Sequence, residues 1–267
     1  MTGDRLQCMM DMSGRVALIT GAAGHVGRAA AAALAELGAD IALVDLADSR
    51  STAETIAAEF GVRTCALDVD LADDAAAREL PARTVSDLGR LDVFVASAAF
   101  VGTSALEGWA VPFDEQDPWS WRAALDVNLT SVFLTTQAAA PALRESGNGS
   151  IVLLSSIYGM VGPDTRLYEG TNMGNPAAYA AGKGALIQFT RWLATVLAPE
   201  VRVNAVSPGG LLRDQPPEFV HRYVARVPIG RMGVEDDIKG AIAFLASDLS
   251  AYVTGHNLVV DGGWTAW

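Results

Sequence analysis

The chain has 267 residues, of which 51% are hydrophobic and 19% are charged, a composition that allows a sizeable hydrophobic core in one large domain. Its formal net charge of -12 argues against anionic partners, namely nucleic acids and acidic membrane surfaces. The two cysteines, Cys8 and Cys65, lie far apart and without metal-ligand spacing, so the sequence predicts neither a disulfide nor a metal site and favours a reducing, cytoplasmic setting.

The N-terminal segment differs in character from the rest of the chain. Residues 1–13 carry Asp4 and Asp11 and no apolar core, so we expect neither a signal peptide nor a membrane span and predict a flexible tail. Residues 14–267 show no linker and no shift in composition. We therefore predict a single domain over 14–267.

Short apolar runs alternate with helical segments from residue 16 onward. The runs predict strands at 16–20, 41–44, 64–67, 93–96, 151–154, 202–205 and 257–260. The intervening segments predict helices at 29–37, 52–60, 72–88, 119–143, 177–197 and 235–246. Continuous apolar strands alternating with helices predict a doubly wound α/β fold, in which a parallel sheet is covered on both faces.

Three long stretches interrupt this alternation, at 98–118, 158–176 and 208–230. Each of them follows a predicted strand. Ligands of open α/β sheets bind outside the carboxyl ends of the strands, so we expect these stretches to form the walls of a pocket. The alternative, that they are ordinary surface loops, is open for any one of them taken alone.

A glycine-rich turn follows the first predicted strand. Residues 20–27 read TGAAGHVG, and Gly21, Gly24 and Gly27 lack a side chain where the backbone must turn or approach a ligand closely. Because the turn opens a helix, its N–H groups can face the pyrophosphate of a dinucleotide. We expect His25 and Val26 to lie beside that cofactor, although His25 also suits a solvent-facing loop position.

A carboxylate at the end of the second strand indicates which dinucleotide is bound. Asp45 can accept hydrogen bonds from the adenosine ribose hydroxyls and would repel a 2'-phosphate. Leu46, which follows it and which we also place at the cofactor, offers no compensating cation. The sequence therefore favours NAD over NADP, with His25 and Arg28 as the cations that could argue for NADP.

Tyr179 and Lys183 lie four residues apart on a predicted helix and so share one of its faces. A neighbouring ammonium stabilises a phenolate, which brings the tyrosine pKa closer to neutral pH and makes it a useful proton donor or acceptor. A solvated pair on an ordinary helix would show the same spacing. The interpretation therefore depends on other motifs.

Several separated motifs agree in their order with one family. From about Gly14 to the C-terminus the chain resembles the short-chain dehydrogenases/reductases, which implies a Rossmann-type, three-layer αβα domain. The matching motifs are the glycine turn, Asp68-Val69, Leu91-Asp92, Asn128, Ser155-Ser156, Tyr179 with Lys183, RVNAVSPG at 202–209, and VTG at 253–255 with VDGG at 260–263.

The resemblance implies an active-site tetrad of Asn128, Ser156, Tyr179 and Lys183. In it Tyr179 exchanges a proton with the substrate oxygen while hydride passes to or from a nicotinamide, and Ser156 hydrogen-bonds the same oxygen. Lys183 holds the nicotinamide ribose and, together with the cationic nicotinamide of the oxidised cofactor, lowers the pKa of Tyr179. Asn128 holds a water that links Lys183 to solvent. Two alternatives are open: Asn128 as a buried hydrogen-bonded group, and Ser155 as the pocket serine.

The resemblance also implies further contacts with the cofactor. Asp68 and Val69 approach the adenine, with a helix cap as the alternative role for Asp68. The remaining contacts lie near the nicotinamide: Ala98, Pro208, Gly209 and Leu211.

Two features depart from the family pattern. Residues 96–99 read ASAA where the family usually has Asn-Asn-Ala-Gly, which removes two amide side chains. The spacing between Ser156 and Tyr179 is also unusually long, because residues 160–175 form an insertion. Its polar residues, with Arg166 to grip an anion and Tyr168 at the substrate, suggest a sugar, sugar acid or sugar phosphate.

These observations predict an NAD-dependent oxidoreductase that interconverts a secondary alcohol and a ketone on a polyhydroxylated substrate. The alternatives are a reductase of 3-oxoacyl thioesters and a nucleotide-sensing protein without turnover. The family usually assembles as a tetramer, or sometimes a dimer, through the helices that carry Asn128 and Tyr179. The apolar residues that suit such a contact are Leu186, Ile187, Phe189 and Leu193.

Overall fold

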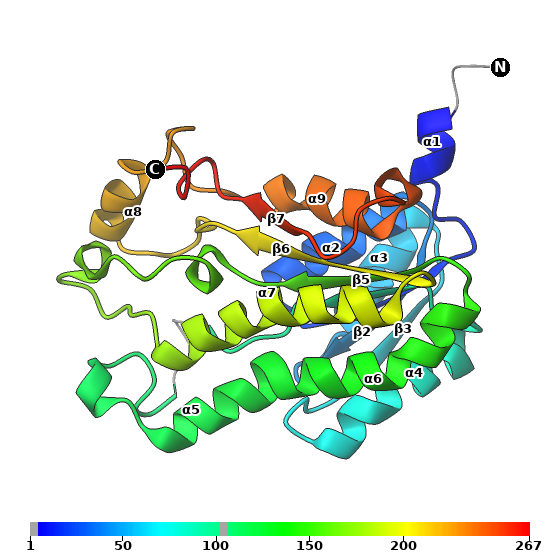
Figure 1. The fold of residues 1–267 in the computed structure, drawn as a ribbon, viewed down its shortest axis with the longest axis horizontal. Helices are drawn as coiled ribbons and strands as arrows, with labels where there is room; N and C mark the ends of the chain where they lie inside the picture. Colours follow the sequence, from blue (N-terminus) through cyan, green and yellow to red (C-terminus); the bar gives the residue numbers. More distant parts are fainter. Residues whose placement is uncertain (1–4, 102–105) are drawn as a thin grey trace.

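The computed structural model describes residues 5–101 and 106–267, and within them seven parallel strands form one sheet in the order β3-β2-β1-β4-β5-β6-β7 (Figure 1). The strands are β1 (Val16–Thr20), β2 (Asp40–Asp45), β3 (Thr64–Asp68), β4 (Val93–Ala96), β5 (Gly149–Leu154), β6 (Val201–Pro208) and β7 (Asn257–Val260). All seven strands that the sequence predicts are confirmed.

Helices cover both faces of this sheet (Figure 1). One face packs against α2 (His25–Glu36), α3 (Arg50–Phe60) and α9 (Asp236–Ala246). The other packs against α4 (Asp74–Leu88), α6 (Ser131–Glu145) and α7 (Ala177–Leu197). The three-layer, doubly wound αβα fold is therefore confirmed.

The strands are apolar throughout because both of their faces are buried. In β1, Leu18 packs into the core beneath α4, α6 and α7, and the next residue, Ile19, packs into the core beneath α2, α3 and α9. In β2, Leu43 and Val44 divide between the two cores in the same way. Successive side chains of a strand point to opposite faces, so a sheet covered on both sides requires continuous rather than alternating hydrophobicity.

The direction of strand addition reverses beside β1. This strand pairs with β2 on one side and with β4 on the other, with Thr20 opposite Val44 and Ala96 at its carboxyl end. The connections leave in opposite directions at such a switch point and open a crevice at the carboxyl edge. The glycine turn and the segment after β4 both begin there.

The long helix predicted at 119–143 is interrupted. It consists of α5 (Pro118–Leu125), a π-helical turn η2 (Asp126–Thr130) and α6. Asn128 lies in the π turn, and its side chain is buried. A π turn adds one residue to the helix and is frequent at functional sites, but hydrophobic periodicity alone does not reveal it.

The N-terminal segment is more ordered than the sequence suggests. Residues 1–4 lie outside the described part, but Arg5–Met10 form α1, none of whose residues is buried. Met12 is fully buried against the α2 side of the sheet, and its N–H donates to the carbonyl of Leu37 at 2.8 Å. The packed domain therefore begins before the predicted boundary at residue 14.

The stretch 208–230 contains a helix that the sequence did not predict, α8 (Pro217–Val224). It packs against η4 (Thr165–Tyr168), a 3-10 turn within the insertion. Further 3-10 turns are η1 (Phe113–Glu115), η3 (Ile157–Gly159) and η5 (Asp248–Ser250). In the described ranges no helix is long and apolar enough to cross a membrane.

The residues predicted for a subunit contact on α7 require correction. Leu186, Ile187 and Leu193 are all less than 7% exposed and belong to the core of this chain, so they are not available to a partner. The exposed large apolar groups on α6 and α7 are Phe133, Trp192 and Val196, and the two aromatic ones lie on either side of Phe189. Phe133 lies 6.2 Å from Phe189, whose ring stacks on that of Trp192 at 6.1 Å between centroids.

Candidate active site

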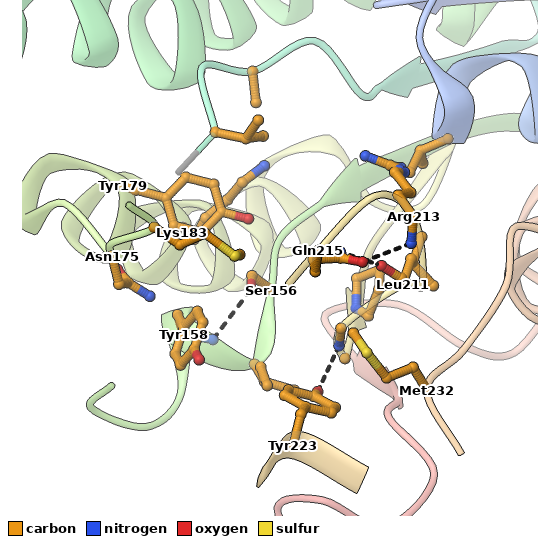
Figure 2. A pocket seen from close by; sticks show the side chains of 18 of the residues that line it. Ser156, Tyr158, Asn175, Tyr179, Lys183, Leu211, Arg213, Gln215, Tyr223 and Met232 are labelled. Atoms are coloured by element: carbon orange, nitrogen blue, oxygen red, sulfur yellow. Dashed lines mark hydrogen bonds between the residues drawn. The ribbon is translucent and has the colours of Figure 1, made fainter. Parts of the chain in front are cut away.

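A cavity opens at the carboxyl edge of the sheet, on the side of β4, β5 and β6 (Figure 2). Ser155 and Ser156 line it from the end of β5, and Tyr179 and Lys183 line it from α7. Parts of all three stretches that follow strands contribute to its wall, as predicted. In the described residues no cluster of three or more potential metal ligands occurs.

Lys183 is a buried ammonium at the base of this cavity. Its side chain lies over the ring of Tyr179, with Nζ 5.6 Å from the ring centroid. The Nζ donates a hydrogen bond to the carbonyl oxygen of Leu154 at 2.6 Å. Burial disfavours the charged form and lowers the pKa of Lys183 to about 8. The predicted helix face that Tyr179 and Lys183 share is thus directed inward.

The side chains around Tyr179 act on its pKa in both directions. Burial raises it, while the hydrogen bond with Ser156 and the charge of Arg213 lower it. Desolvation of a phenolate outweighs the favourable contacts, so the protein's own side chains keep Tyr179 protonated at neutral pH.

The structure separates the roles of the two serines. The hydroxyl of Ser155 donates to the backbone carbonyl of Lys183 at 2.8 Å and so ties β5 to α7. Ser156 instead directs its hydroxyl to Tyr179 and accepts a hydrogen bond from the N–H of Tyr158 at 3.2 Å. Ser156 is therefore the serine that lies on the side of Tyr179 (Figure 2), and Ser155 supports the helix.

Asn128 acts as a clamp between two chain segments. Its Oδ1 accepts from the N–H of Phe100 at 2.7 Å, and its Nδ2 donates to the carbonyl of the same residue at 3.2 Å. The side chain is 1% exposed. The structure thus shows the buried, hydrogen-bonded alternative, in which Asn128 fixes the segment after β4 beside α7.

The glycine turn packs closely against that same segment. Gly21 has φ of +69°, and a Cβ there would lie 2.7 Å from the backbone of Ala98. A Cβ on Gly27 would lie 2.1 Å from the carbonyl oxygen of Gly21. Gly24 is the N-cap of α2 without a side-chain cap, so the first N–H groups of the helix remain available to an anion. This arrangement fits the pyrophosphate of a dinucleotide.

Asp45 is fixed at the end of β2 beside this turn. Its Oδ2 accepts from the N–H of Ala23 at 2.8 Å, and its Oδ1 accepts from that of Ala47 at 3.1 Å. Leu46 is 73% exposed, and His25 is exposed on the turn with its Nδ1 3.6 Å from Glu235. The carboxylate therefore stands where the resemblance implies a ribose contact.

The adenine residues also lie at the carboxyl edge. Val69 is buried, and its N–H donates to the carbonyl of Asp45 at 2.8 Å. Asp68 is exposed and accepts from the N–H of Ser49 at 3.4 Å. The N-cap of the following helix, α4, is Asp73, so Asp68 does not cap that helix.

Of the four residues expected near the nicotinamide, three line the cavity and one does not. The cavity is lined by Pro208, Gly209 and Leu211. Ala98 packs against Gly21 instead, and its neighbours Ser97 and Ala99 line the cavity. One of these, Ser97, replaces a family asparagine. Its hydroxyl donates to the carbonyl of Thr20 at the end of β1 and thereby joins neighbouring strands. A serine hydroxyl thus joins β1 to the segment after β4 at a position where the family usually has an amide.

Of the two residues of the insertion predicted at the substrate, one lies at the cavity and the other does not. Tyr168 lines the cavity, and its hydroxyl donates to that of Tyr158 at 2.8 Å. Arg166 does not line it: the side chain is 76% exposed and binds both carboxylate oxygens of Asp164, at 2.8 and 2.9 Å. A local partner two residues away satisfies the arginine before it can reach the cavity.

Several polar residues of the cavity were missed from the sequence, namely Ser97, Tyr158, Asn175, Arg213, Gln215 and Tyr223. The Oδ1 of Asn175 is buried and has no partner among the described residues. Arg213 stands in the short segment after Pro208-Gly209 where the family often has a threonine. That substitution was the available signal, since a cation there is unusual for the motif.

Comparison with known proteins establishes the family. Residues 21–265 match the family model described as Enoyl-(Acyl carrier protein) reductase. The chain belongs to the short-chain dehydrogenase/reductase family.

Three relatives of known name cover almost the entire chain. It is 36% identical to cis-4-hydroxycyclohexanecarboxylate dehydrogenase of Sinomonas cyclohexanicum, over 94% of this chain and 97% of that protein. It is 36% identical to L-rhamnose 1-dehydrogenase (NAD(P)(+)) of Sphingomonas sp., over 94% and 96%. It is 33% identical to 3-oxoacyl-[acyl-carrier-protein] reductase of Synechocystis sp., over 96% and 98%. The chain is therefore an oxidoreductase of this family.

Two solved structures show the same fold with a nicotinamide cofactor. A putative 2-deoxy-D-gluconate 3-dehydrogenase from Agrobacterium tumefaciens, with bound NADP, matches with a TM-score of 0.82 and 31% identity over 97% of this chain and 99% of that one. A short-chain dehydrogenase from Leptospira borgpetersenii, with bound NAD+, matches with a TM-score of 0.85 and 28% identity over 99% and 97%. These neighbours support a nicotinamide cofactor without deciding between the two forms.

The buried Lys183 predicts a pH dependence of stability. Above about pH 8 the folded protein releases this proton, whereas the unfolded chain holds it up to about pH 10.5. The unfolded state binds more protons in that window, so the contribution of Lys183 to the free energy of unfolding rises with pH by about 3 kcal/mol. Urea unfolding at pH 8 and pH 10 measures the rise.

The Lys183→Met variant provides the comparison, because it should lack this rise. Lys239→Met, which removes a lysine paired with Asp236 on α9, should keep the wild-type slope. A Lys183→Met protein with the same pH dependence as wild type would contradict the assignment.

Proposed function

We propose that this protein is an NAD-dependent dehydrogenase/reductase that interconverts a secondary alcohol and a ketone on a sugar, sugar acid or other polyhydroxylated ring. The observation that carries the proposal is the position of Tyr179: a half-buried phenol in the main cavity, beside Ser156 and backed by the ammonium of Lys183. A proton donor, an orienting hydroxyl and a cation are what exchange of a proton at a carbonyl oxygen requires.

In this proposal each residue acts on one oxygen atom of the substrate. Ser156 orients that oxygen by a hydrogen bond, and Tyr179 gives it a proton or takes one from it. Burial keeps Tyr179 protonated, which suits donation to a ketone, and the nearby ammonium of Lys183 favours the phenolate that remains. The glycine turn and Asp45 hold the nicotinamide cofactor, which when bound supplies or accepts the hydride.

Polar groups around Tyr179 support a hydroxyl-bearing substrate. The Oδ1 of Asn175 is a buried acceptor without a partner in the described chain. The hydroxyls of Tyr158 and Tyr168 share one hydrogen bond at 2.8 Å, which leaves the pair with further hydrogen-bonding capacity for a ligand. Unpaired buried polar groups are costly, so a ligand hydroxyl that pairs with them gains affinity. Relatives named for L-rhamnose and for a hydroxycyclohexanecarboxylate act on rings of this kind.

A second candidate is the reduction of 3-oxoacyl thioesters, which the Synechocystis relative favours by its name. Arginines near the rim could attract an acidic carrier protein. However, Arg166 and Arg226 both bind Asp164, and Arg222 donates to the carbonyls of Leu167 and Glu169. These cations are used within the chain, and the net charge of -12 opposes such a partner.

Assays that follow NADH absorbance test the proposal. The substrate panel contains sugars, sugar acids, polyols, 4-hydroxycyclohexanecarboxylate and 3-oxoacyl thioesters. We expect Tyr179→Phe to lose roughly 10²-fold to 10⁴-fold in kcat because the proton donor is gone. NADH affinity, measured by fluorescence, should remain within about threefold, since Phe retains the ring packing.

Tyr252→Phe is the matched control, because the side chain of Tyr252 is fully exposed, and it should behave as wild type. Undiminished turnover in Tyr179→Phe would refute the mechanism. Turnover of thioesters alone would favour the second candidate, and cofactor binding without turnover of any substrate would indicate a nucleotide sensor.

The preference for NAD is a separate part of the proposal, and it rests on Asp45. A carboxylate fixed beside the ribose repels a 2'-phosphate, so kcat/KM with NAD should exceed that with NADP by about tenfold or more. Asp45→Ser should lower this ratio by at least about tenfold, because it removes the repulsion between the carboxylate and the 2'-phosphate of NADP. Steady-state kinetics with both cofactors measure it.

Asp48→Ser serves as the control, since Asp48 is exposed and accepts only from the N–H of Arg50. It should leave the ratio unchanged. A wild-type enzyme that prefers NADP would show the assignment of Asp45 to be wrong.

We also propose that the protein is a homo-oligomer, a tetramer or a dimer, that uses the aromatic patch of Phe133, Phe189 and Trp192. Trp192 is 56% exposed and Phe133 is 42% exposed, on two helices that lie side by side. Aromatic groups are enriched in the buried centres of protein interfaces.

Light scattering after size exclusion should give a mass that is a multiple of the chain mass. Trp192→Lys should shift it to a smaller species, because a charge would be buried in the contact. Leu6→Lys, on exposed α1, should not change it. A monomeric wild type would refute this assembly.

A further inference from the structure

The main cavity carries a charge opposite in sign to that of the protein. The chain has 31 acidic and 19 basic residues, yet among the described residues that line the cavity there is no carboxylate. Two cations line it, Lys183 and Arg213. The mechanism uses Lys183, whereas Arg213 has no role so far. A cation in a cavity of this kind favours an anionic ligand group.

Backbone contacts fix Arg213 at the rim of the cavity. The segment after Pro208-Gly209 runs beside Gly233, where the N–H of Leu212 donates to the carbonyl of Gly233 at 2.8 Å. The N–H of Arg213 donates to Oε1 of Gln215 at 2.6 Å. In Figure 2 Arg213 and Tyr179 lie on opposite sides of Ser156 and come from different elements.

Glu235 connects Arg213 to the glycine turn. The Nε of Arg213 donates to Oε1 of Glu235 at 3.1 Å, and the same oxygen lies 3.6 Å from Nδ1 of His25, the first residue of α2. Val26, the next residue of the turn, lines the cavity together with Arg213. Arg213 and the first residue of α2 thus share one carboxylate, that of Glu235.

The hydrogen-bonding capacity of Arg213 is only partly used. Nε binds Glu235, and the two Nη atoms have no protein partner in the part of the chain that the structure describes. Its charge also reaches Tyr179 and lowers the pKa of that phenol. The unpaired end of the guanidinium presents the planar fork that suits phosphate oxygens.

We propose that Arg213 is a cofactor-binding residue whose guanidinium binds the pyrophosphate of the dinucleotide from the side opposite the glycine turn, in competition with Glu235. This inference rests on the proposed function, because it requires a nicotinamide dinucleotide in the cavity. The glycine turn binds the pyrophosphate through backbone N–H groups, and Arg213 adds a full charge from the opposite wall. Glu235 holds the arginine in place and partly neutralises it.

Calorimetric titration with NADH and with ADP-ribose tests the proposal without any turnover. ADP-ribose keeps both phosphates and lacks the nicotinamide. Arg213→Gln should weaken both ligands alike, by roughly 10-fold to 100-fold, because a charge-assisted hydrogen bond is lost. Arg213→Lys keeps the charge and should weaken them by less than about tenfold.

Glu235→Gln should tighten both ligands by about threefold to tenfold, because the competing carboxylate is removed. This gain should vanish in the double variant Arg213→Gln/Glu235→Gln. Arg166→Gln removes an exposed arginine outside the cavity and should leave both dissociation constants unchanged.

Three results would overturn the proposal. Weakening of NADH but not of ADP-ribose would assign Arg213 to the nicotinamide carboxamide. If Arg213→Gln bound NADH and ADP-ribose as wild type does, the proposal would be wrong. A KM raised in this variant for a carboxylated substrate, but not for the corresponding amide, would then assign Arg213 to the substrate. A wild-type protein that binds neither NADH nor ADP-ribose would refute the proposed function itself. Failure of the Arg213 inference is distinguishable from this, because the wild type would then still bind both ligands.

Discussion

The arrangement of the site depends on how α7 is attached to the end of β5. Two hydrogen bonds run between them in opposite directions: Nζ of Lys183 donates to the carbonyl of Leu154, and the hydroxyl of Ser155 donates to the carbonyl of Lys183. A buried ammonium must be paired, so it fixes the rotation of the helix about its axis. That rotation directs Tyr179 toward Ser156. Gly159 permits the close approach, since a Cβ there would lie 2.7 Å from the backbone of Lys183.

The outer wall of the cavity is built on a second, smaller apolar core. Leu167 from the insertion, Phe219 and Tyr223 from α8, and Trp264 from the C-terminal segment pack together there. Polar contacts support this packing, because Arg226 pairs with Asp164 of the insertion and Tyr223 accepts from the N–H of Gly210. The insertion and α8 therefore form one wall rather than two independent loops. Its buried face sets the shape of the site, and its few unpaired polar atoms set the chemistry that the site can recognise.

The fold and the central site could be predicted from the sequence because both depend on local patterns. Apolar runs place the strands, and the order of a parallel sheet brings Tyr179, Ser156 and the glycine turn to one edge. Side-chain direction in irregular segments could not be predicted, because it depends on partners distant in sequence. Arg166 turns to Asp164 and away from the cavity, whereas Arg213, passed over in the sequence, enters the cavity because Glu235 holds it there. Leu186 shows the converse error, an apolar residue assigned to a surface that it does not reach.

The π turn η2 changes which neighbours the two helices on either side of it, α5 and α6, can contact. Each residue of an α-helix advances about 100° around the axis, so the additional residue of a π turn rotates everything after it by about that angle. The rod before the turn, α5, packs on α7, and the rod after it, α6, packs on α4. A regular helix with one apolar stripe would serve only one of these neighbours. Because of the extra residue, the apolar face of α5 and the apolar face of α6 point in different directions. Asn128 lies in the turn between them.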